Sequence, residues 1–367
     1  MSTRHFANLT RPLTIGRALD VPNRTYFSSI GFDLCDPAGR PLPEFFETYA
    51  SLMRGGCGFG FLGNASVDPV SQYTDRSLKL TSDAHAEALR PVFTAARRQA
   101  FALGVQLQHY GARESDGGIA GLDEARIAHY VDCFVDAARR ALAIGAPVLQ
   151  IHAANGYLLS SFLSPRTNQR VDRWGGTPLR RAALLLEIVR RVRALAHDGV
   201  AILVRLQVDD GHDDGLRVEQ LGEVVAALEA AGTDAITCAT GVADTFGKFL
   251  GDRAYTLDLS RRAARFLKRE TRMPVGFAAN LDSLAVADAI VASGDADFVG
   301  FGRAVVADHG FVAKELAGRA ATVDRCRWDS YCLRDKKEPA ADRVFCCVNP
   351  SYPRPQSIQL KYQENPA

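Results

Sequence analysis

The sequence predicts an α/β fold, a (β/α)₈ TIM barrel with a C-terminal extension. Short apolar runs alternate with helical patterns almost throughout, and eight such repeats fit within about 300 residues, close to the typical barrel size of about 250 residues plus insertions. Polar residues suited to catalysis stand where the predicted strands end, as they do in such barrels. An open doubly wound sheet is the alternative, but its first strand would lead into a glycine-rich fingerprint, and residues 28–31 (Ser-Ser-Ile-Gly) do not form one.

The apolar runs predict strands over residues 25–30, 58–63, 104–109, 148–152, 201–206, 235–239, 275–279 and 298–301. The segments between them predict helices over residues 43–54, 83–103, 123–144, 178–197, 218–231, 257–270, 283–293 and 312–318. One helix shows a clear apolar stripe at helical spacing, made of Leu184, Leu185, Ile188, Val189 and Val192. Glycines stand where helices are expected to stop, at Gly104, Gly145, Gly199, Gly232 and Gly294.

The bulk composition is that of an ordinary soluble globular protein. Of the 367 residues, 47% are hydrophobic and 23% are charged, and the formal net charge is +2. This balance gives no reason to expect nucleic acid or a membrane surface as a partner, and no apolar run is long enough to span a membrane. The first 23 residues lack the apolar core of a signal peptide, so we expect a cytoplasmic protein whose eight cysteines are reduced thiols or metal ligands rather than disulfides.

The most informative segment follows the fourth predicted strand. His152, Asn155 and Tyr157 fall within six positions, just after the apolar run 147–151. His152 and Asn155 can both donate hydrogen bonds to one oxygen, and Tyr157 can donate a proton nearby, which suits a carbonyl whose oxygen gains negative charge during a reaction. Each residue taken alone has a plainer interpretation, because a single His on a strand is usually structural and Asn-Gly is an ordinary turn.

Further polar residues stand at the ends of the other predicted strands, so that all of them would meet at one end of the barrel. Loops after the seventh and eighth strands commonly hold a phosphate against backbone N–H groups, and an Arg there adds a bidentate charge partner. The whole series comprises Ser28, Ser29, Asn64, Gln106, His109, Arg205, Asn280, Gly302 and Arg303.

These motifs resemble the old yellow enzyme family of FMN-dependent ene-reductases over nearly the whole chain. The most specific segment runs from His152 to Gly176 and reads HAANGYLLSSFLSPRTNQRVDRWGG. Supporting segments are Pro22-Asn23-Arg24, Gly104-Val105-Gln106-Leu107-Gln108-His109, Val204-Arg205-Leu206 and Phe301-Gly302-Arg303.

The resemblance implies an FMN-dependent NAD(P)H oxidoreductase of the ene-reductase type. Hydride would pass from NADPH or NADH through the flavin to an activated C=C bond of an α,β-unsaturated carbonyl or related compound. His152 and Asn155 would bind the substrate oxygen over the flavin, and Tyr157 would donate the proton. The residues implied for FMN binding are Ser28, Ser29, Ile30, Asn64, Gln106, Arg205, Ala279, Asn280, Gly302 and Arg303.

Other functions remain open on the same residues. An FMN-dependent dehydrogenase, isomerase or amine demethylase of a specific pathway would use the same site, because function belongs to the site rather than to the fold. An electron-transfer or interaction protein that works through its cysteine-rich tail is a third interpretation, and a flavin-free barrel lyase is a fourth. In the leading interpretation the partner is a small-molecule substrate, and a homo-oligomer is left open.

Two departures from the family pattern lie near the expected site. The loop over residues 110–122 is short and Gly117-Gly118 loosens it, which predicts a more open pocket or one that another loop or subunit closes. Gly31 stands where some members place a thiol that tunes the flavin, and Cys35 follows four residues later.

The third departure concerns the cysteines near the C-terminus. Their spacing resembles the iron–sulfur segment of the 2,4-dienoyl-CoA reductase and trimethylamine dehydrogenase type, with Cys326, Cys332 and Cys347 in place. Asp329 stands at the middle position and Cys346 adjoins Cys347, so a four-thiolate site is incomplete. We therefore expect no metal and no iron–sulfur cluster, and a structural tail of residues 321–367 packed on a barrel of residues 1–320.

Overall fold

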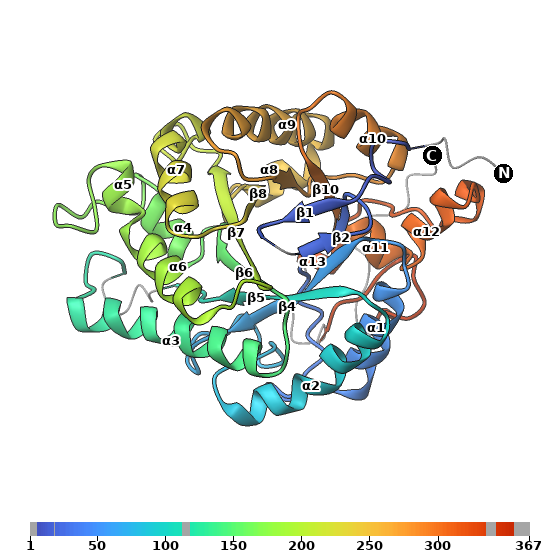
Figure 1. The fold of residues 1–367 in the computed structure, drawn as a ribbon, viewed down its shortest axis with the longest axis horizontal. Helices are drawn as coiled ribbons and strands as arrows, with labels where there is room; N and C mark the ends of the chain where they lie inside the picture. Colours follow the sequence, from blue (N-terminus) through green and yellow to red (C-terminus); the bar gives the residue numbers. More distant parts are fainter. Residues whose placement is uncertain (1–5, 18, 112–117, 335–342, 356–367) are drawn as a thin grey trace.

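Eight parallel strands close into a barrel, as the sequence predicts (Figure 1). The computed structural model describes residues 6–17, 19–111, 118–334 and 343–355. Each strand pairs with the next one along the chain, and the last strand pairs with the first to close the ring. The strands are β3 (Thr25–Phe27), β4 (Phe59–Ser66), β5 (Ala102–Gln108), β6 (Val148–Ala153), β7 (Ala201–Asp209), β8 (Ala235–Thr240), β9 (Val275–Phe277) and β10 (Phe298–Phe301).

Amphipathic helices surround the barrel, because each buries one apolar stripe against the strands. The stripe predicted for residues 184–192 is confirmed, since all five of its residues are buried. The ring contains α1 (Pro43–Met53), α2 (Asp83–Arg98), α3 (Glu124–Ala143), α6 (Ala183–Leu195), α7 (Gly222–Ala230), α9 (Arg253–Glu270), α10 (Leu284–Ala292) and α12 (Phe311–Leu316). Shorter elements are α4 (Leu158–Leu163), α5 (Pro178–Arg181), η2 (Val218–Gln220), α8 (Phe246–Gly251), α11 (Arg303–Ala307), η3 (Ala320–Thr322) and α13 (Tyr331–Arg334).

Some predicted boundaries were wrong. The helix predicted over residues 83–103 ends at Arg98, and Gly104, which was expected to stop it, lies inside β5. The chain reverses earlier, at Ala100, whose φ of 50° is left-handed. Ala100 and Leu103 continue the helical spacing of α2, so periodicity alone extends the helix too far. The helix predicted over residues 178–197 is divided between α5 and α6.

An antiparallel hairpin, β1 (Leu13–Ile15) and β2 (Leu19–Val21), closes the amino-terminal end of the barrel. In Figure 1 the hairpin lies across the middle of the barrel. Its apolar side chains form one buried cluster with Tyr26, Phe59 and Phe298 at the starts of their strands. The sequence did not predict the hairpin, because strands of three residues are too short to display a two-residue period.

The described part of the C-terminal tail contacts the barrel. Asn349 Nδ2 donates a hydrogen bond to the carbonyl of Val306 at 2.7 Å. The ring of Tyr352 stacks on that of Phe32 with centroids 5.4 Å apart, and its Oη lies 2.7 Å from His309 Nε2. These contacts support a tail packed on the barrel, while the boundary between the two segments stays a prediction.

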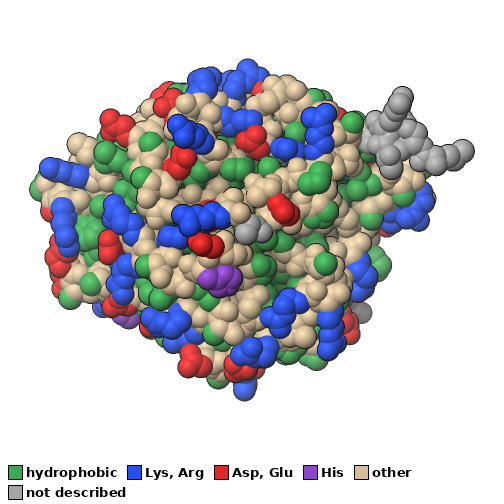
Figure 2. All heavy atoms as spheres, in the orientation of Figure 1, with side chains coloured by type: hydrophobic (Ala, Val, Ile, Leu, Met, Phe, Trp, Pro, Cys, Tyr) green, Lys and Arg blue, Asp and Glu red, His purple; other side chains and the backbone are tan. Residues whose placement is uncertain are grey.

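The face that carries the hairpin is mixed in charge. Figure 2 shows basic and acidic side chains interspersed with apolar ones on this face. That pattern accords with a formal net charge of +2. Within the described ranges, no helix combines the length and apolar character needed to cross a membrane.

Candidate active site

A cavity opens at the carboxyl-terminal end of the barrel strands, opposite the hairpin. It encloses about 920 Å³, the solvent at its mouth included. The structure brings together most of the predicted site residues here: Ser28, Ser29, Ile30, Asn155, Arg205, Ala279, Asn280, Gly302 and Arg303 all line the cavity. The remaining four, Asn64, Gln106, His152 and Tyr157, are not among its lining residues.

Arg303, the first residue of α11, is a buried cation at one side of the cavity. Its side chain donates hydrogen bonds to Ser330 Oγ, at 2.6 Å, and to Asn280 Oδ1. Both partners are neutral, and no carboxylate of the described chain forms an ion pair with this guanidinium. Burial lowers the pKa of Arg303. Because a buried charge is normally paired, an anion in the cavity would complete this arrangement.

Trp328 from the tail contacts two guanidinium groups. The Cζ of Arg253 is 3.9 Å and that of Arg303 is 4.5 Å from the centroid of the indole ring, within range of cation–π attraction. Trp328 Nε1 donates to Asp282 Oδ2 at 3.1 Å. The tail therefore contributes Trp328 and Cys332 to the cavity lining. Sequence reasoning missed Trp328, because a Trp in a segment without periodicity carries no positional signal.

Arg205 reaches the cavity from β7. Its Nη1 donates to Ser28 Oγ at 3.2 Å, and no ion pair to a carboxylate of the described chain neutralises it. Burial lowers the pKa of Arg205. The buried hydroxyl of Ser29 has no hydrogen-bond partner among the described residues. Arg205 and Ser29 therefore offer the cavity hydrogen-bonding capacity that the protein itself leaves unused.

His152, in β6, and Tyr157, four residues after the end of that strand, lie side by side. Their rings meet edge to face, with centroids 5.3 Å apart. His152 is 3% exposed, and its Nδ1 has no hydrogen-bond partner among the described residues. Burial, helped by the charge of Arg205, lowers the pKa of His152 well below its usual value, so the imidazole is neutral at pH 7. Burial raises the pKa of Tyr157 to about 12, so its phenol keeps its proton.

Asn155 is held at the cavity edge by a constrained turn. Its φ of 61° is left-handed, a conformation that Asn tolerates better than most residues. The Asn155 N–H donates to Gln207 Oε1 at 2.8 Å, and its Nδ2 lies 3.4 Å from the carbonyl of Gly241. Contacts from β7 and from the loop after β8 thus fix the position of this carboxamide.

Gln106 is buried inside the barrel and belongs to a chain of polar side chains. Its Nε2 donates to Gln150 Oε1 at 2.7 Å, and Gln150 Nε2 donates to Thr237 Oγ1 at 3.0 Å. The chain links β5, β6 and β8, which keeps these polar groups satisfied in the core. Sequence reasoning missed Gln150, although a Gln within an apolar strand was a usable signal.

Two tyrosines form a wall beside Tyr157. The ring of Tyr110 meets that of Tyr157 edge to face at 5.0 Å and stacks on that of Tyr73 at 5.6 Å, measured between centroids. Asn64 Nδ2 donates to Tyr110 Oη at 2.8 Å and to Gln108 Oε1 at 2.7 Å. Asn64 therefore orients this wall. Sequence reasoning missed Tyr73 and Tyr110, although the place of Tyr110 directly after the third predicted strand could have drawn attention to it.

The loop over residues 110–122 is described only in part. Residues 112–117, including Gly117, lie outside the described residues. The second half is anchored by Arg170, whose Nη1 donates to the carbonyls of Ile119 and Leu122, each at 2.8 Å. The more open pocket expected from this loop stays a prediction.

Two cysteines near the cavity have thiols whose pKa is raised by burial. Cys35 lines a smaller cavity together with Ile30 and Asn64, and burial raises its pKa to about 12. In the tail, Cys326 Sγ accepts from the N–H of Trp328 at 3.4 Å. Burial raises the pKa of Cys326 to about 11. Within the described residues no cysteine forms a disulfide, and the expected absence of a metal in the tail stays a prediction.

Comparison with known proteins identifies related sequences. A family model described as the NADH:flavin oxidoreductase / NADH oxidase family matches residues 119–321. The chain is 27% identical over 343 residues to an NADH oxidase of Thermoanaerobacter brockii, covering 88% of this chain and 52% of that protein. It is 28% identical over 330 residues to an NADPH dehydrogenase of Bacillus subtilis (strain 168), covering 84% of this chain and 95% of that protein. An N,N-dimethylglycine/sarcosine dehydrogenase of Chromohalobacter salexigens is 25% identical over 372 residues, covering 94% and 53%.

The chain thus spans about half the length of two of these relatives.

Solved structures share its fold. A 2-naphthoyl-CoA reductase superposes with a TM-score of 0.86 at 22% identity, covering 94% of this chain and 57% of that one. An old yellow enzyme homologue from Zymomonas mobilis superposes with a TM-score of 0.71 at 21% identity, covering 85% of this chain and 93% of that one. These likenesses confirm the predicted barrel.

Proposed function

Because the chain belongs to the NADH:flavin oxidoreductase / NADH oxidase family, a family of FMN-dependent oxidoreductases, we propose that it reduces an activated C=C bond with hydride from NADH or NADPH. When bound, FMN would supply the hydride-transfer chemistry between the nicotinamide and the substrate. The observation that carries the proposal is the buried Nδ1 of His152, which has no hydrogen-bond partner among the described residues and belongs to a ring that lies beside the phenol of Tyr157.

The chemistry of the cavity fits FMN. Two guanidinium groups without carboxylate partners in the described chain, those of Arg205 and Arg303, line the same cavity. Apart from Gly302 itself and its two chain neighbours, no described residue has a heavy atom within 4 Å of the position that a Cβ on Gly302 would take, so the backbone there is open to a phosphate. The proposed phosphate partners are Ala279, Asn280, Gly302 and Arg303. The proposed ring partners are Ser28, Ser29, Ile30, Asn64, Gln106 and Arg205.

His152 and Asn155 are proposed to bind the substrate oxygen. Two fixed donors stabilise an oxygen that gains negative charge in the transition state more than they stabilise the ground-state carbonyl. A neutral imidazole is suited to this role, because it donates one N–H without carrying a charge that burial would disfavour. Asn155 does not titrate, so half of this oxygen-binding pair is independent of pH.

Tyr157 is proposed to protonate the α-carbon. A general acid must hold its proton at the working pH and lie within reach of the atom that accepts it. The raised pKa of Tyr157, about 12, meets the first condition across the neutral range. Its ring contacts with His152 and Tyr110 hold the phenol beside the group proposed to bind the substrate oxygen, which favours the second.

A second candidate is an FMN-dependent dehydrogenase of amines. It is favoured by the likeness to the N,N-dimethylglycine/sarcosine dehydrogenase, which covers 94% of this chain. In that case the cavity would accept a tertiary or secondary amine, and the substrate would reduce the cofactor instead of being reduced.

One experiment separates these functions. The protein, purified or reconstituted with FMN, is titrated anaerobically with NADPH, NADH, sarcosine and N,N-dimethylglycine, and flavin bleaching is followed by visible absorbance. We expect a nicotinamide nucleotide to bleach the flavin and 2-cyclohexenone to restore its colour. Bleaching by the amines without turnover of the enone would favour the second candidate. A protein that takes up no FMN would exclude both.

A further inference from the structure

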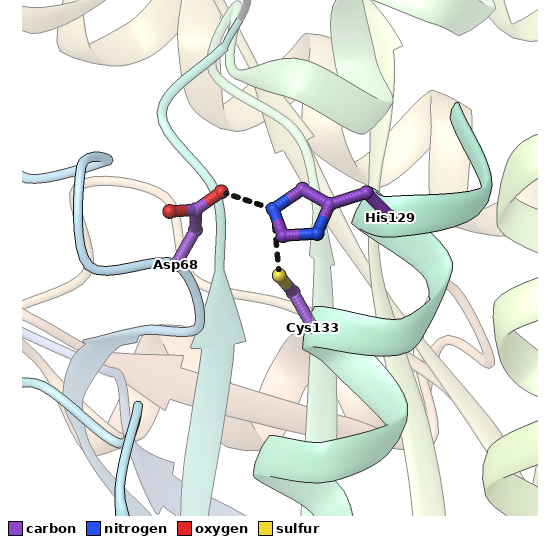
Figure 3. A group of neighbouring side chains, drawn as sticks. All are labelled: Asp68, His129 and Cys133. Carbon is purple, nitrogen blue, oxygen red and sulfur yellow. Dashed lines mark hydrogen bonds and ion pairs between the residues drawn. The ribbon is translucent and has the colours of Figure 1, made fainter. Parts of the chain in front are cut away.

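Three side chains with metal-ligating atoms converge outside the cavity, between the loop after β4 and helix α3 (Figure 3). His129 and Cys133 stand one helical turn apart on α3, and Asp68 approaches them from the loop. His129 Nε2 lies 3.2 Å from Asp68 Oδ2 and 3.5 Å from Cys133 Sγ. We propose that Asp68, His129 and Cys133 bind one Zn²⁺ ion, with water as the fourth ligand.

The two separations measured from His129 Nε2 are close to those of a tetrahedral zinc site, and all three ligand atoms lie within 4.8 Å of one another. Bonds of about 2.0–2.1 Å to nitrogen, about 2.0–2.2 Å to oxygen and about 2.3 Å to sulfur place tetrahedral ligands about 3.4 Å apart for N and O and about 3.6 Å apart for N and S. The distances in the protein are 3.2 Å and 3.5 Å. The donor set also selects the metal, since Mg²⁺ and Ca²⁺ prefer oxygen ligands whereas zinc accepts imidazole, thiolate and carboxylate together.

The direction of approach argues against a nucleophilic cysteine. In a Cys-His-Asp catalytic arrangement, the thiol contacts one imidazole nitrogen and the carboxylate orients the ring through the other. Here Asp68 and Cys133 both face Nε2 of His129 (Figure 3). One ring nitrogen has either a lone pair or a single hydrogen, so it serves two neighbours poorly. A cation placed between the three atoms would bind all of them.

Neighbouring groups hold the carboxylate of Asp68 in the orientation that a metal ligand would need. Asp68 is buried, and its Oδ1 accepts a hydrogen bond from the N–H of Val70 at 3.0 Å, which leaves Oδ2 directed at the imidazoles. His109 Nδ1 accepts from the N–H of Gly111 at 3.1 Å, which orients the ring so that its Nε2 lies 3.5 Å from Asp68 Oδ2. His109 is therefore a positioning residue behind the ligand Asp68, as metal sites commonly require.

Access and charge also suit a cation. The His129 side chain is half exposed, so solvent reaches the open side of the site and can supply both the ion and the fourth ligand. Within the described chain, the ion-pair partners of the buried Asp68 carboxylate are the side chains of two histidines. A divalent ion would neutralise this carboxylate and a Cys133 thiolate at once.

A metal bound here would stabilise the loop that supports the wall of Tyr73 and Tyr110. Ser71, in the same loop as Asp68, accepts a hydrogen bond from the N–H of Tyr110 at 2.7 Å. Tyr73, two residues further on, stacks on Tyr110. An ion that joins Asp68 to α3 would therefore fix the loop that supports the two tyrosines, and its role would be structural.

The test is a Co²⁺ titration of the 367-residue chain after treatment with chelator. Tetrahedral Co²⁺ gives ligand-field bands to the red of flavin absorption, and a cobalt–thiolate bond adds a charge-transfer band in the near ultraviolet. We expect both bands to saturate at one equivalent and to disappear on addition of Zn²⁺. Cys133→Ser should lose the thiolate band, and His129→Gln should weaken binding at least tenfold. Asp132→Asn, a neighbouring exposed carboxylate on α3, is the matched control and should bind as the wild type does.

Two further measurements make the outcome decisive. Zn²⁺ should raise the thermal unfolding midpoint of the wild type and leave that of His129→Gln unchanged. A Cys326→Ser/Cys346→Ser variant should retain the cobalt spectrum. If the wild type shows no thiolate band, or if the band survives Cys133→Ser and vanishes in the tail variant, the proposal is wrong.

Discussion

The two ends of the barrel are built from the same strands and differ in almost every physical respect. At the amino-terminal end, the rings of Tyr26, Phe59 and Phe298 lie 5.2–5.7 Å apart beneath the hairpin and are buried. At the carboxyl-terminal end, His152 and Arg205 offer polar groups that the described chain leaves without partners or ion pairs. The position of a residue along its strand, rather than the strand it belongs to, decides whether it serves stability or ligand binding.

Tyr157→Phe is expected to give the largest effect. Removal of the phenolic proton should slow reduction of 2-cyclohexenone by about 10²–10⁴-fold, the usual contribution of a general acid. Flavin reduction by NAD(P)H should stay near the wild-type rate, because it needs no proton from this residue. Stopped-flow measurement of both half-reactions checks this, and an equal loss in both would remove Tyr157 from the proton-donor role.

Phe59→Ala tests the amino-terminal end of the barrel, beneath the hairpin. Truncating a fully buried ring is expected to reduce the free energy of unfolding by about 3–5 kcal/mol, as measured by urea denaturation. The rate of enone reduction by the folded fraction should change little, because the hairpin end is separated from the cavity by the length of the barrel. A selective loss of activity without loss of stability would contradict the division of roles between the two ends.

Asn155→Ala should weaken the proposed binding of the substrate oxygen. Loss of one such donor typically lowers the rate by about 10²–10³-fold. Affinity for phenols that form charge-transfer complexes with the flavin should fall as well, and absorbance titration measures it. Asn155→Asp is a useful companion, because it keeps the shape of the side chain but replaces a donor with an acceptor. Unchanged phenol binding in both variants would argue against this role.

The smallest expected effect is a pH dependence of the free energy of unfolding that arises from His152. Burial lowers its pKa in the folded protein, so the stability gained by keeping it neutral is present above the unfolded pKa of about 6.5 and is lost as the pH falls below it. His152 contributes at most about 1.4 kcal/mol per pH unit to the slope of the unfolding free energy against pH. Urea denaturation between pH 7.5 and 5.5 should show a shallower decline for His152→Gln than for the wild type. Identical slopes would mean that His152 is not buried in its neutral form.

Much of the barrel was predictable because each of its elements carries a local signal. The strand Phe298–Phe301 was placed correctly at both ends, and the apolar stripe of α6 identified its buried face. The hairpin was missed because its stability comes from contacts with strand starts that are distant in sequence. The end of α2 was misplaced because apolar spacing continues past Arg98 into β5.

The site was predictable where a motif or a strand end marked it. The resemblance to the old yellow enzyme family is confirmed at the family level, and nine of the predicted residues line one cavity. Trp328 and Tyr73 escaped notice because they reach the site from segments without periodicity. The cluster of Asp68, His129 and Cys133 was also missed, since His and Cys four residues apart on a helix gain meaning only when a distant carboxylate joins them.

The closure of the barrel has a consequence for synthesis of the chain. Strand β3 gains its second neighbour only when β10 arrives, since Val299 pairs with Thr25 and Phe301 with Phe27. Until residue 301 has left the ribosome, β3 remains an open edge, available to pair with other chains. Contacts so far apart in sequence also form slowly. We therefore expect the nascent chain to stay incompletely folded through most of its translation and to depend on protection from aggregation during that time.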